Sequence, residues 1–255
     1  MNENILSVRK LTKSFGAVQA LDNVDVFVSQ GELCGLIGPN GSGKSTFFDC
    51  CTGLVAKDSG TILLDGIDIT NWPLHRIALE GRLIRSFQRN VVMGSMTVVE
   101  NLLVAGQMHT FPSVLSTFLN GRATKARMKQ LRSRCSSLIE LVGLEQVSNT
   151  IASELSVGQQ KLLQFASVMM SSPRLVLMDE PLSGVNPVLV ERLSRNIQQV
   201  NRETGTTFII IEHNIEAIMD FCPRIVVFNA GRKIADGTPQ EILKDNKVRE
   251  AYLGG

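Results

Sequence analysis

The chain has 255 residues, of which 44% are hydrophobic and 20% charged, so it is a globular chain long enough for one large core or two small domains. Its 26 basic and 24 acidic residues give a formal net charge of +2, which is too near neutral for a dedicated nucleic-acid binder. The five cysteines (Cys34, Cys50, Cys51, Cys135 and Cys222) have no C-x-x-C spacing and several lie in apolar runs, which predicts buried, reduced thiols instead of disulfides or a metal site.

The N-terminal residues 1–4 lack the features of a signal peptide. No apolar run approaches the roughly 20 residues that a membrane-spanning helix needs. We therefore expect a soluble protein. Such a protein can still dock on a partner that is embedded in a membrane.

Two segments near the N-terminus, residues 5–9 and 24–28, alternate apolar and polar residues. This pattern predicts antiparallel strands with one solvated face. Between them, residues 11–16 are predicted to form a turn that contains Phe15 just before Gly16. Phe15 is either a core anchor or a platform for a purine base, since aromatic rings stack on bases, and the residue alone favours neither.

A glycine-rich loop follows an apolar run at residues 33–37, predicted to be a buried strand, and precedes a helix predicted to begin at residue 46. Residues 38–45 match the phosphate-binding pattern G-x-x-x-x-G-K-[ST] in the strand-loop-helix setting that the pattern requires. The glycines let the backbone N–H groups and the helix N-terminus form an anion nest. Lys44 is then placed to contact the β- and γ-phosphates, and the Ser45 hydroxyl to ligate Mg²⁺. The motif predicts a nucleoside triphosphate site formed by Gly38, Pro39, Asn40, Gly41, Ser42, Gly43, Lys44, Ser45 and Thr46.

The next elements are shorter. Residues 59–66 predict a strand that ends in an Asp-Gly turn, and residues 73–80 a short helix. Residues 83–87 predict another strand, followed by Gln88. This polar residue leaves the sheet where ligands of α/β folds collect.

The character of the chain changes between residues 97 and 170. A helix is predicted to open at residues 100–104, with a break near residue 111. Residues 125–142 have apolar side chains at helical spacing. Their opposite face is basic, and it fits a solvated surface better than a site for phospholipid headgroups or an acidic partner; its cations are Arg122, Lys125, Arg127, Lys129, Arg132 and Arg134. We predict a helical subdomain, at about residues 90–170, inserted into an α/β core.

Residues 153–160 lead into a long helix that runs through Met170. A serine and a glycine before a helix are compatible with a second anion-binding N-terminus and with a simple helix cap. Taken alone, the residues favour the cap.

Residues 174–181 form an apolar run closed by Asp179, Glu180 and a proline. Such a run is typical of a central parallel strand that is buried on both faces. Two acids at its carboxyl end are better explained by chemistry than by a helix cap. Asp179 suits Mg²⁺, and Glu180 suits a general base for the attacking water.

The C-terminal part begins with a predicted amphipathic helix at residues 187–200 and an apolar strand at 206–211 that ends before His213. A lone histidine is usually structural. Because this one lies at the end of a strand in a chain that also carries phosphate and metal motifs, a functional role is favoured. The remaining segments predict a hairpin across residues 225–235 and short helices at 239–243 and 248–253.

This set of motifs, in this order, resembles the ATP-binding-cassette (ABC) family over nearly the whole chain. Residues 38–45 match its Walker A loop and residues 155–159 its signature segment, which is far more specific than a lone Walker A. The resemblance gives further residues their roles: Phe15 as the adenine-stacking aromatic, Gln88 as the Q-loop glutamine, Asp179 and Glu180 as the Walker B aspartate and catalytic glutamate, and His213 as the switch histidine.

Within the family, the chain looks most like the ATPases of high-affinity branched-chain amino acid importers. The resemblance lies in residues 84–90, 96–102, 183–187 and 251–254, and in the long segment 106–125. Urea and amide importers and lipopolysaccharide-export ATPases share much of this and remain open. Asn186 stands where many cassettes have aspartate, although the importer subgroup commonly has this asparagine.

The resemblance implies a single α/β domain over residues 1–255: a P-loop NTPase (RecA-like) core with an N-terminal antiparallel β subdomain and the inserted helical subdomain. Two cassettes would pair head to tail, each ATP lying between the Walker A loop of one and Ser156, Gly158 and Gln159 of the other. Mg²⁺ would be held by Ser45, Gln88 and Asp179, and Gln88 would couple the metal site to the helical subdomain.

The implied partners are a homologous or identical second ATPase subunit, integral membrane permease subunits and, indirectly, an extracytoplasmic solute-binding protein. No nucleic-acid partner is expected, and the implied location is peripheral, on the cytoplasmic face of the inner membrane. A soluble cassette acting on nucleic acid or ribosomes is disfavoured because the chain has neither a second cassette nor a long coiled-coil insert. A regulatory, non-hydrolysing cassette is disfavoured because Glu180 and His213 are both present.

Overall fold

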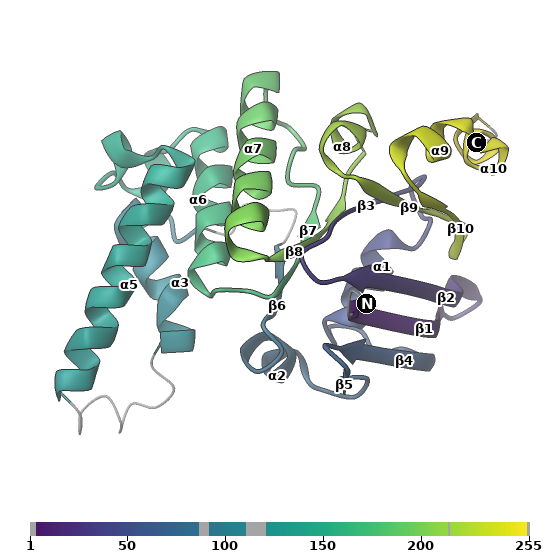
Figure 1. Cartoon of the computed structure of the whole chain (residues 1–255), viewed down its shortest axis with the longest axis horizontal. Coiled ribbons are helices and arrows are strands. Elements are labelled where there is room, and N and C mark those ends of the chain that lie inside the picture. The colour runs from purple at the N-terminus through teal and green to yellow at the C-terminus, as the bar shows by residue number, and fades with distance from the viewer. Residues whose placement is uncertain (1–3, 87–91, 111–120, 214, 254–255) are drawn as a thin grey trace. The chain divides into compact units, whose positions relative to one another are not determined.

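The computed structural model describes residues 4–86, 92–110, 121–213 and 215–253 (Figure 1). The chain divides into two compact units. The first comprises Met1–Arg85, Arg174–Gly184 and Ile197–Gly255, and the second comprises Ser86–Pro173 and Val185–Asn196. Gln88 lies outside the described residues.

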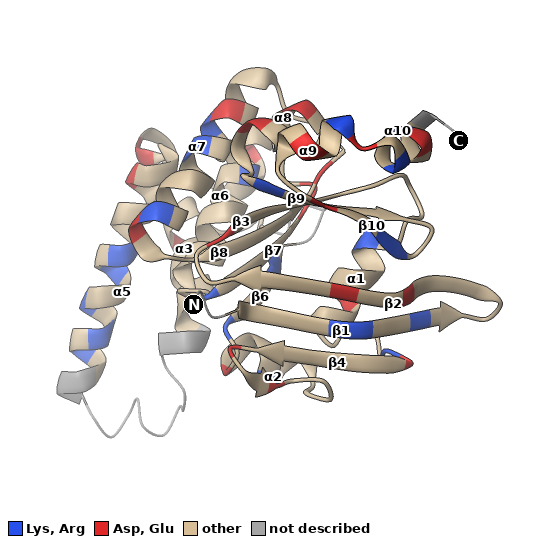
Figure 2. Ribbon diagram, turned by 45° about the vertical axis from the view of Figure 1, so that its right-hand side comes forward, with Lys and Arg blue, Asp and Glu red and all other residues tan. Residues whose placement is uncertain are grey.

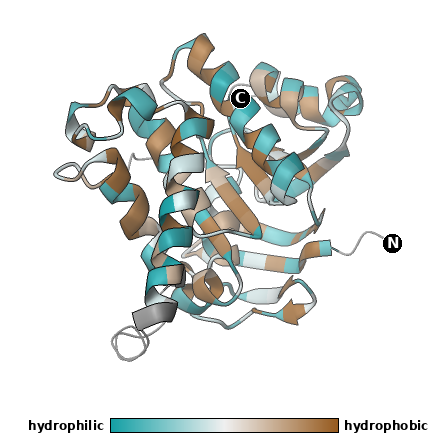
Figure 3. Ribbon diagram, turned by 60° about the vertical axis from the view of Figure 1, so that its left-hand side comes forward, coloured by the Kyte–Doolittle hydropathy of each residue, from teal (hydrophilic) through white to brown (hydrophobic). Residues whose placement is uncertain are grey.

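A six-stranded sheet with strand order β10-β9-β3-β8-β7-β6 forms the centre of the first unit. Three central strands, β3 (Leu33–Ile37), β8 (Thr207–Ile211) and β7 (Leu175–Asp179), pair in parallel and are buried at every residue. In the hydropathy colouring of Figure 3, the ribbon of the central strands is largely brown, which marks hydrophobic residues. This confirms the buried strands predicted from the apolar runs at residues 33–37 and 174–181, because a strand covered on both faces has no polar alternation.

The outer strands of this sheet are β6 (Leu83–Ser86), β9 (Arg224–Asn229) and β10 (Arg232–Gly237). β9 pairs in parallel with β3, and β10 returns antiparallel to β9, as the predicted hairpin requires. Four helices of this unit agree with the sequence: α1 (Lys44–Cys51), α2 (Leu74–Leu79), α9 (Pro239–Lys244) and α10 (Asn246–Leu253). A fifth, α8 (Ile215–Phe221), was not predicted.

The N-terminal sheet is antiparallel, with order β2-β1-β4-β5. Its strands are β1 (Asn4–Phe15), β2 (Val18–Ser29), β4 (Ser59–Leu64) and β5 (Ile67–Asp68). The turn predicted at residues 11–16 begins only at Gly16, because β1 continues to Phe15. Register shifts interrupt the β1–β2 pairing, and Lys10 (φ 49°) and Asn23 (φ 50°) have left-handed backbones beside one of them. Such bulges break the period-two alternation on which the prediction depended.

The second unit is mainly helical. α3 (Val98–Thr110), α5 (Gly121–Val142) and α6 (Val157–Met170) pack on one another, with Leu131, Cys135 and Leu138 of α5 buried. α7 (Pro187–Thr204) begins in this unit. Of the cations predicted to be solvated, those with exposed side chains are Lys125, Arg127, Lys129 and Arg132, and α5 carries blue bands along its length in Figure 2. Arg134 is half-buried instead, because it donates to the Met169 carbonyl of α6, and the side chain of Arg122 lies outside the described residues. In the described parts of the chain, we find no helix long and apolar enough to cross a membrane.

The five cysteines are all buried and free, which confirms the prediction of reduced thiols. Burial raises the pKa of each thiol above its ordinary value of 9.0. These side chains therefore stay uncharged and act as small apolar core residues.

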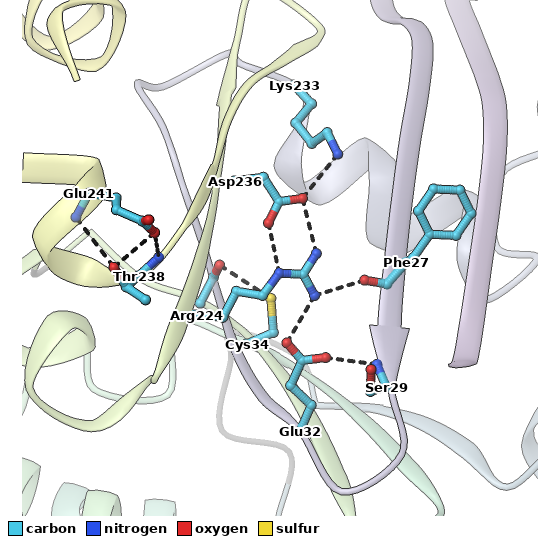
Figure 4. Close-up of polar contacts among 10 residues, drawn as sticks. Phe27, Ser29, Glu32, Cys34, Arg224, Lys233, Asp236, Thr238 and Glu241 are labelled. Atoms are coloured by element: carbon cyan, nitrogen blue, oxygen red, sulfur yellow. Dashed lines mark hydrogen bonds and ion pairs between the residues drawn. The ribbon is translucent and has the colours of Figure 1, made fainter. Parts of the chain in front are cut away.

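An ion-pair network around Arg224 connects the C-terminal hairpin with the end of β2 and the start of β3 (Figure 4). The Arg224 guanidinium donates to both carboxylate oxygens of Asp236 (2.7 and 3.0 Å), to the Phe27 carbonyl (2.8 Å) and to Glu32 (2.9 Å). Lys233 donates to Asp236 as well (3.0 Å). Burial alone would raise the pKa of Asp236, but the hydrogen bonds from Arg224 and Lys233 outweigh it and hold that pKa below the ordinary 3.8.

We predict that Arg224→Met lowers the free energy of unfolding by about 3 kcal/mol at neutral pH, because it leaves two partly buried carboxylates without their main partner. The Asp236 pKa is depressed in the folded state, so its contribution to stability is present above its unfolded pKa and is lost as pH falls through its folded pKa. The difference in free energy of unfolding between wild type and variant should therefore become smaller below about pH 4.

Urea unfolding at a series of pH values measures this difference. Arg195→Met, which breaks the exposed pair with Glu191, is the matched control and should change stability by less than about 0.5 kcal/mol. Equal stability of Arg224→Met and wild type at neutral pH, or a difference that widens in acid, would contradict the prediction.

Candidate functional site

The glycine-rich loop joins β3 to α1 and is held tightly by its neighbours. A Cβ atom on Gly38 would lie 2.1 Å from the carbonyl oxygen of Phe228, and one on Gly43 would lie 2.4 Å from that of Ala20. Gly43 also has a left-handed backbone (φ 100°) at the start of α1. These two glycines are thus required by close backbone packing on β9 and β2 as well as by the bend that the motif predicts.

Lys44, the first residue of α1, folds its side chain back over this loop. Its ammonium group donates to the carbonyl oxygens of Gly38 (2.8 Å) and Pro39 (3.0 Å), and the residue is 6% exposed. Burial lowers the pKa of Lys44, while the negative charges of Glu180 and Asp179 act in the opposite direction. The two acids at the carboxyl end of β7, Asp179 and Glu180, therefore act electrostatically on the lysine of the loop.

Glu180 lies immediately after β7 in an uncommon backbone conformation. Its N–H donates to the Ile211 carbonyl of the neighbouring β8 (2.9 Å), and its φ of 50° is in the left-handed region. That conformation costs on the order of 1 kcal/mol for a residue with a Cβ, and such strain gathers at functional sites. Glu180 Oε1 accepts a hydrogen bond from His213 Nε2 (2.7 Å), since a carboxylate can only accept. The structure thus brings together two residues predicted from separate strands.

Glu212 is a site residue that the sequence analysis missed. It is 2% exposed, and its carboxylate accepts from the backbone N–H groups of Leu182 (2.5 Å) and His213 (3.2 Å). It therefore fixes the loop after Glu180 against the segment that carries His213. The signal was present, because Glu212 closes an apolar strand just as Asp179 does.

Arg85 was missed as well. Its guanidinium forms ion pairs with Asp179 (2.8 Å) and with Asp49 of α1, and its side chain is 9% exposed. A lone arginine in an otherwise uncharged edge strand, three residues before Gln88, was the signal available in the sequence.

The signature segment lies in the second unit, where Ser156 caps α6. Ser156 Oγ accepts from the Gln159 N–H (3.2 Å), and the Gln159 side chain accepts from the Ser156 N–H (3.0 Å), which is a complete capping box. A Cβ atom on Gly158 would lie 2.5 Å from Leu189 Cδ2, so this glycine lets α6 approach α7. The helix cap favoured by the residues alone is present.

Asn186 has a local role. Its Oδ1 atom accepts from the Leu189 N–H (2.9 Å) and so caps α7. An aspartate would cap the helix equally well. The asparagine therefore keeps the cap without adding a negative charge.

Phe15 ends β1 and is 49% exposed, with Lys13 Nζ 5.1 Å from its ring centre. The alternative that Phe15 is a core anchor is therefore wrong. A platform for a base stays a prediction, and so does the part assigned to Gln88.

Comparison with known proteins agrees with these motifs. A family model described as ABC transporter matches residues 21–183, and one described as branched-chain amino acid ATP-binding cassette transporter matches residues 232–255. The high-affinity branched-chain amino acid transport ATP-binding protein BraF of Pseudomonas aeruginosa is 37% identical over 100% of this chain and 99% of its own length. LivG of Escherichia coli, whose name describes the same function, is 35% identical with the same coverage.

Solved structures are similar as well. A nucleotide-free ATP-binding cassette from an ABC transporter superposes with a TM-score of 0.84 at 32% identity, covering 99% of this chain and 100% of the other. An ATP-binding cassette of an ABC transporter in its ADP conformation superposes with a TM-score of 0.84 at 31% identity, covering 99% of each chain. The predicted fold class, a P-loop core with an antiparallel β subdomain and helical insertion, is confirmed. The chain therefore belongs to the ABC transporter family, as one of its ATP-hydrolysing cassettes.

Proposed function

We propose that this chain powers the import of branched-chain amino acids across the cytoplasmic membrane. The observation that carries the proposal is the match at residues 232–255 to the branched-chain transporter model, together with full-length similarity to BraF and LivG. The general ABC match over residues 21–183 would fit urea importers and lipopolysaccharide exporters equally well. The C-terminal match favours the branched-chain class.

In the proposed nucleotide site, Phe15 stacks on adenine and residues 38–46 hold the phosphates. Two observations support this assignment: Lys44 donates to the loop carbonyls, and the negative charges of Glu180 and Asp179 act to raise its pKa against the lowering effect of burial. The Ser45 hydroxyl and the Asp179 carboxylate, with Gln88, are oxygen donors of the kind that Mg²⁺ prefers, and their chemistry fits this ion. Mg²⁺ bound with ATP neutralises charge on the β- and γ-phosphates.

Glu180 is the proposed general base, with His213 as its partner. Their hydrogen bond holds one carboxylate oxygen of Glu180 in a fixed direction. The backbone bond to Ile211 and the left-handed φ fix the main chain beneath it. A base held at both ends needs little reorganisation when it accepts the proton of the attacking water.

The second cassette is identical or homologous to this chain. It is proposed to supply its equivalents of Ser156, Gly158 and Gln159 to the nucleotide held by this chain, and this chain supplies its own three residues to the nucleotide of the second cassette. Val157 and Val188, beside the N-termini of α6 and α7, are 58% and 74% exposed, which suits surfaces that a partner covers. The proposed complex also contains permease subunits and, indirectly, an extracytoplasmic solute-binding protein. This chain would lie on the cytoplasmic face of the inner membrane.

Deleting the gene is expected to abolish uptake of radiolabelled leucine at low external concentration and to leave urea uptake unchanged. Supplying the wild-type gene should restore leucine uptake, whereas a gene carrying Glu180→Gln should not. Normal leucine uptake with loss of urea uptake would reject the branched-chain assignment in favour of the urea and amide class.

Ser156→Arg is expected to leave ATP binding by the isolated monomer unchanged while abolishing turnover, because Ser156 acts on the partner's nucleotide. Binding of a fluorescent ATP analogue and phosphate release measure the two quantities. Ser136→Arg, at an exposed position of α5, should change neither. Loss of monomer binding in Ser156→Arg would place Ser156 at the nucleotide of its own chain.

Glu180→Gln is expected to slow ATP hydrolysis by about 10²–10⁴-fold, the usual loss when a general base is removed. Nucleotide affinity should hold or rise, because a negative charge near the phosphates disappears. ATP should then persist and hold two cassettes together.

Size-exclusion chromatography with ATP and Mg²⁺ detects the dimer, with the variant run by itself and together with the partner cassette. A phosphate-release assay on the same samples measures hydrolysis. Glu191→Gln, at a position 68% exposed, is the matched control. Turnover near that of wild type would remove Glu180 from catalysis. Arrested turnover without a dimer in either sample would reject the shared site.

A further inference from the structure

Arg85 connects the two elements that carry the proposed magnesium donors. It is the charged residue of β6, and its side chain is 9% exposed. Nη1 pairs with Oδ1 of Asp49 on α1, and Nη2 pairs with Oδ2 of Asp179 at the end of β7 (2.8 Å). The guanidinium carbon lies 5.7 Å from the ring centre of Phe48, also on α1.

This geometry needs an arginine. Two different nitrogens of one planar guanidinium reach two carboxylates on separate elements, and each keeps a defined direction. The ammonium group of a lysine is a point charge and would not hold both in this way. The Asp179 side chain is 9% exposed and that of Asp49 is 24% exposed, so water replaces little of the lost interaction if the arginine is removed.

The two elements joined by Arg85 contribute to one proposed metal site. Ser45 lies four residues before Asp49 on α1, so both belong to the same short helix. Asp179 is the last residue of β7. Because the Asp179 pair uses Oδ2, the direction of Oδ1 is fixed as well.

We propose that Arg85 is a positioning residue that orients Asp179, relative to the Ser45 end of α1, for Mg²⁺ bound with the nucleotide. The inference rests on the nucleotide site proposed above and assigns a role to a residue outside its motifs. Arg85 acts through Asp179 and does not itself contact the reacting atoms.

Two effects of removing Arg85 oppose each other. Loss of a positive charge near the metal site would strengthen Mg²⁺ attraction, whereas loss of the hydrogen bonds would leave the carboxylate without a fixed direction. Partners that orient a metal ligand usually change metal affinity by about 10- to 100-fold when removed. If Arg85 positions Asp179, its removal should weaken Mg²⁺ binding. If Arg85 acts only through its charge, its removal should strengthen Mg²⁺ binding.

The test titrates Mg²⁺ against binding of a fluorescent ATP analogue by the full chain and repeats the measurement in EDTA. For Arg85→Gln, the Mg²⁺ concentration at half-saturation should rise about 10- to 100-fold, and the affinity in EDTA should change by less than about threefold. Arg85→Lys should give an intermediate shift. Arg76→Gln, which breaks an exposed pair with Glu80, is the matched control and should give none.

Asp49→Ala is a second variant that leaves the Arg85–Asp179 pair in place and releases α1. It should raise the Mg²⁺ concentration at half-saturation by a smaller factor than Arg85→Gln does. If thermal unfolding shows that Arg85→Gln does not fold, Asp49→Ala replaces it in the test. An unchanged or lowered Mg²⁺ requirement in the folded variants would overturn the proposal.

Asp179→Asn separates this inference from the proposed function. If Asp179→Asn raises the Mg²⁺ requirement and Arg85→Gln does not, the positioning role fails and the magnesium site stands. If neither variant raises it, the assignment of Asp179 to Mg²⁺ fails and the role of Arg85 fails with it.

Discussion

The ammonium group of Lys44, buried against the carbonyls of its own loop, is the interaction on which the rest of this site depends. A buried lysine is unfavourable unless its charge is hydrogen-bonded and balanced. The carbonyls of Gly38 and Pro39 supply the bonds, and Asp179 and Glu180 supply the negative charge. The loop can present those carbonyls because its glycines pack against neighbouring backbone, where a side chain would clash.

The two units provide different chemistry. The first holds the phosphate loop and the acids, whereas the second offers Ser156 at the N-terminus of α6. In the capping box, Ser156 Oγ acts as an acceptor, so its hydroxyl proton is still available to a phosphate oxygen. The cap and the proposed contact with the partner's nucleotide are therefore compatible, and the cap orients the hydroxyl for that contact.

Much of the fold could be predicted where local sequence decides structure. The strands ending at Ile37 and Asp179 are apolar up to that aspartate because both faces are covered. The polar and glycine-rich residues at their carboxyl ends were therefore the candidates for the site. β1 was predicted too short because bulges interrupt its alternation. Glu212 and Arg85 were missed because their significance arises from partners at Leu182 and Asp179, distant in sequence. Periodicity records which face is buried, but not which buried charges meet.

The measurement that tests the central claim most directly is an experimental structure of the full chain carrying Glu180→Gln with ATP and Mg²⁺ bound. The shared-site mechanism predicts the γ-phosphate within hydrogen-bonding distance of Lys44 Nζ, with Asp179 beside the metal and Ser156 of a second cassette on the same phosphate. A triphosphate bound away from Lys44, or contacted by Ser156 of its own chain, would contradict it.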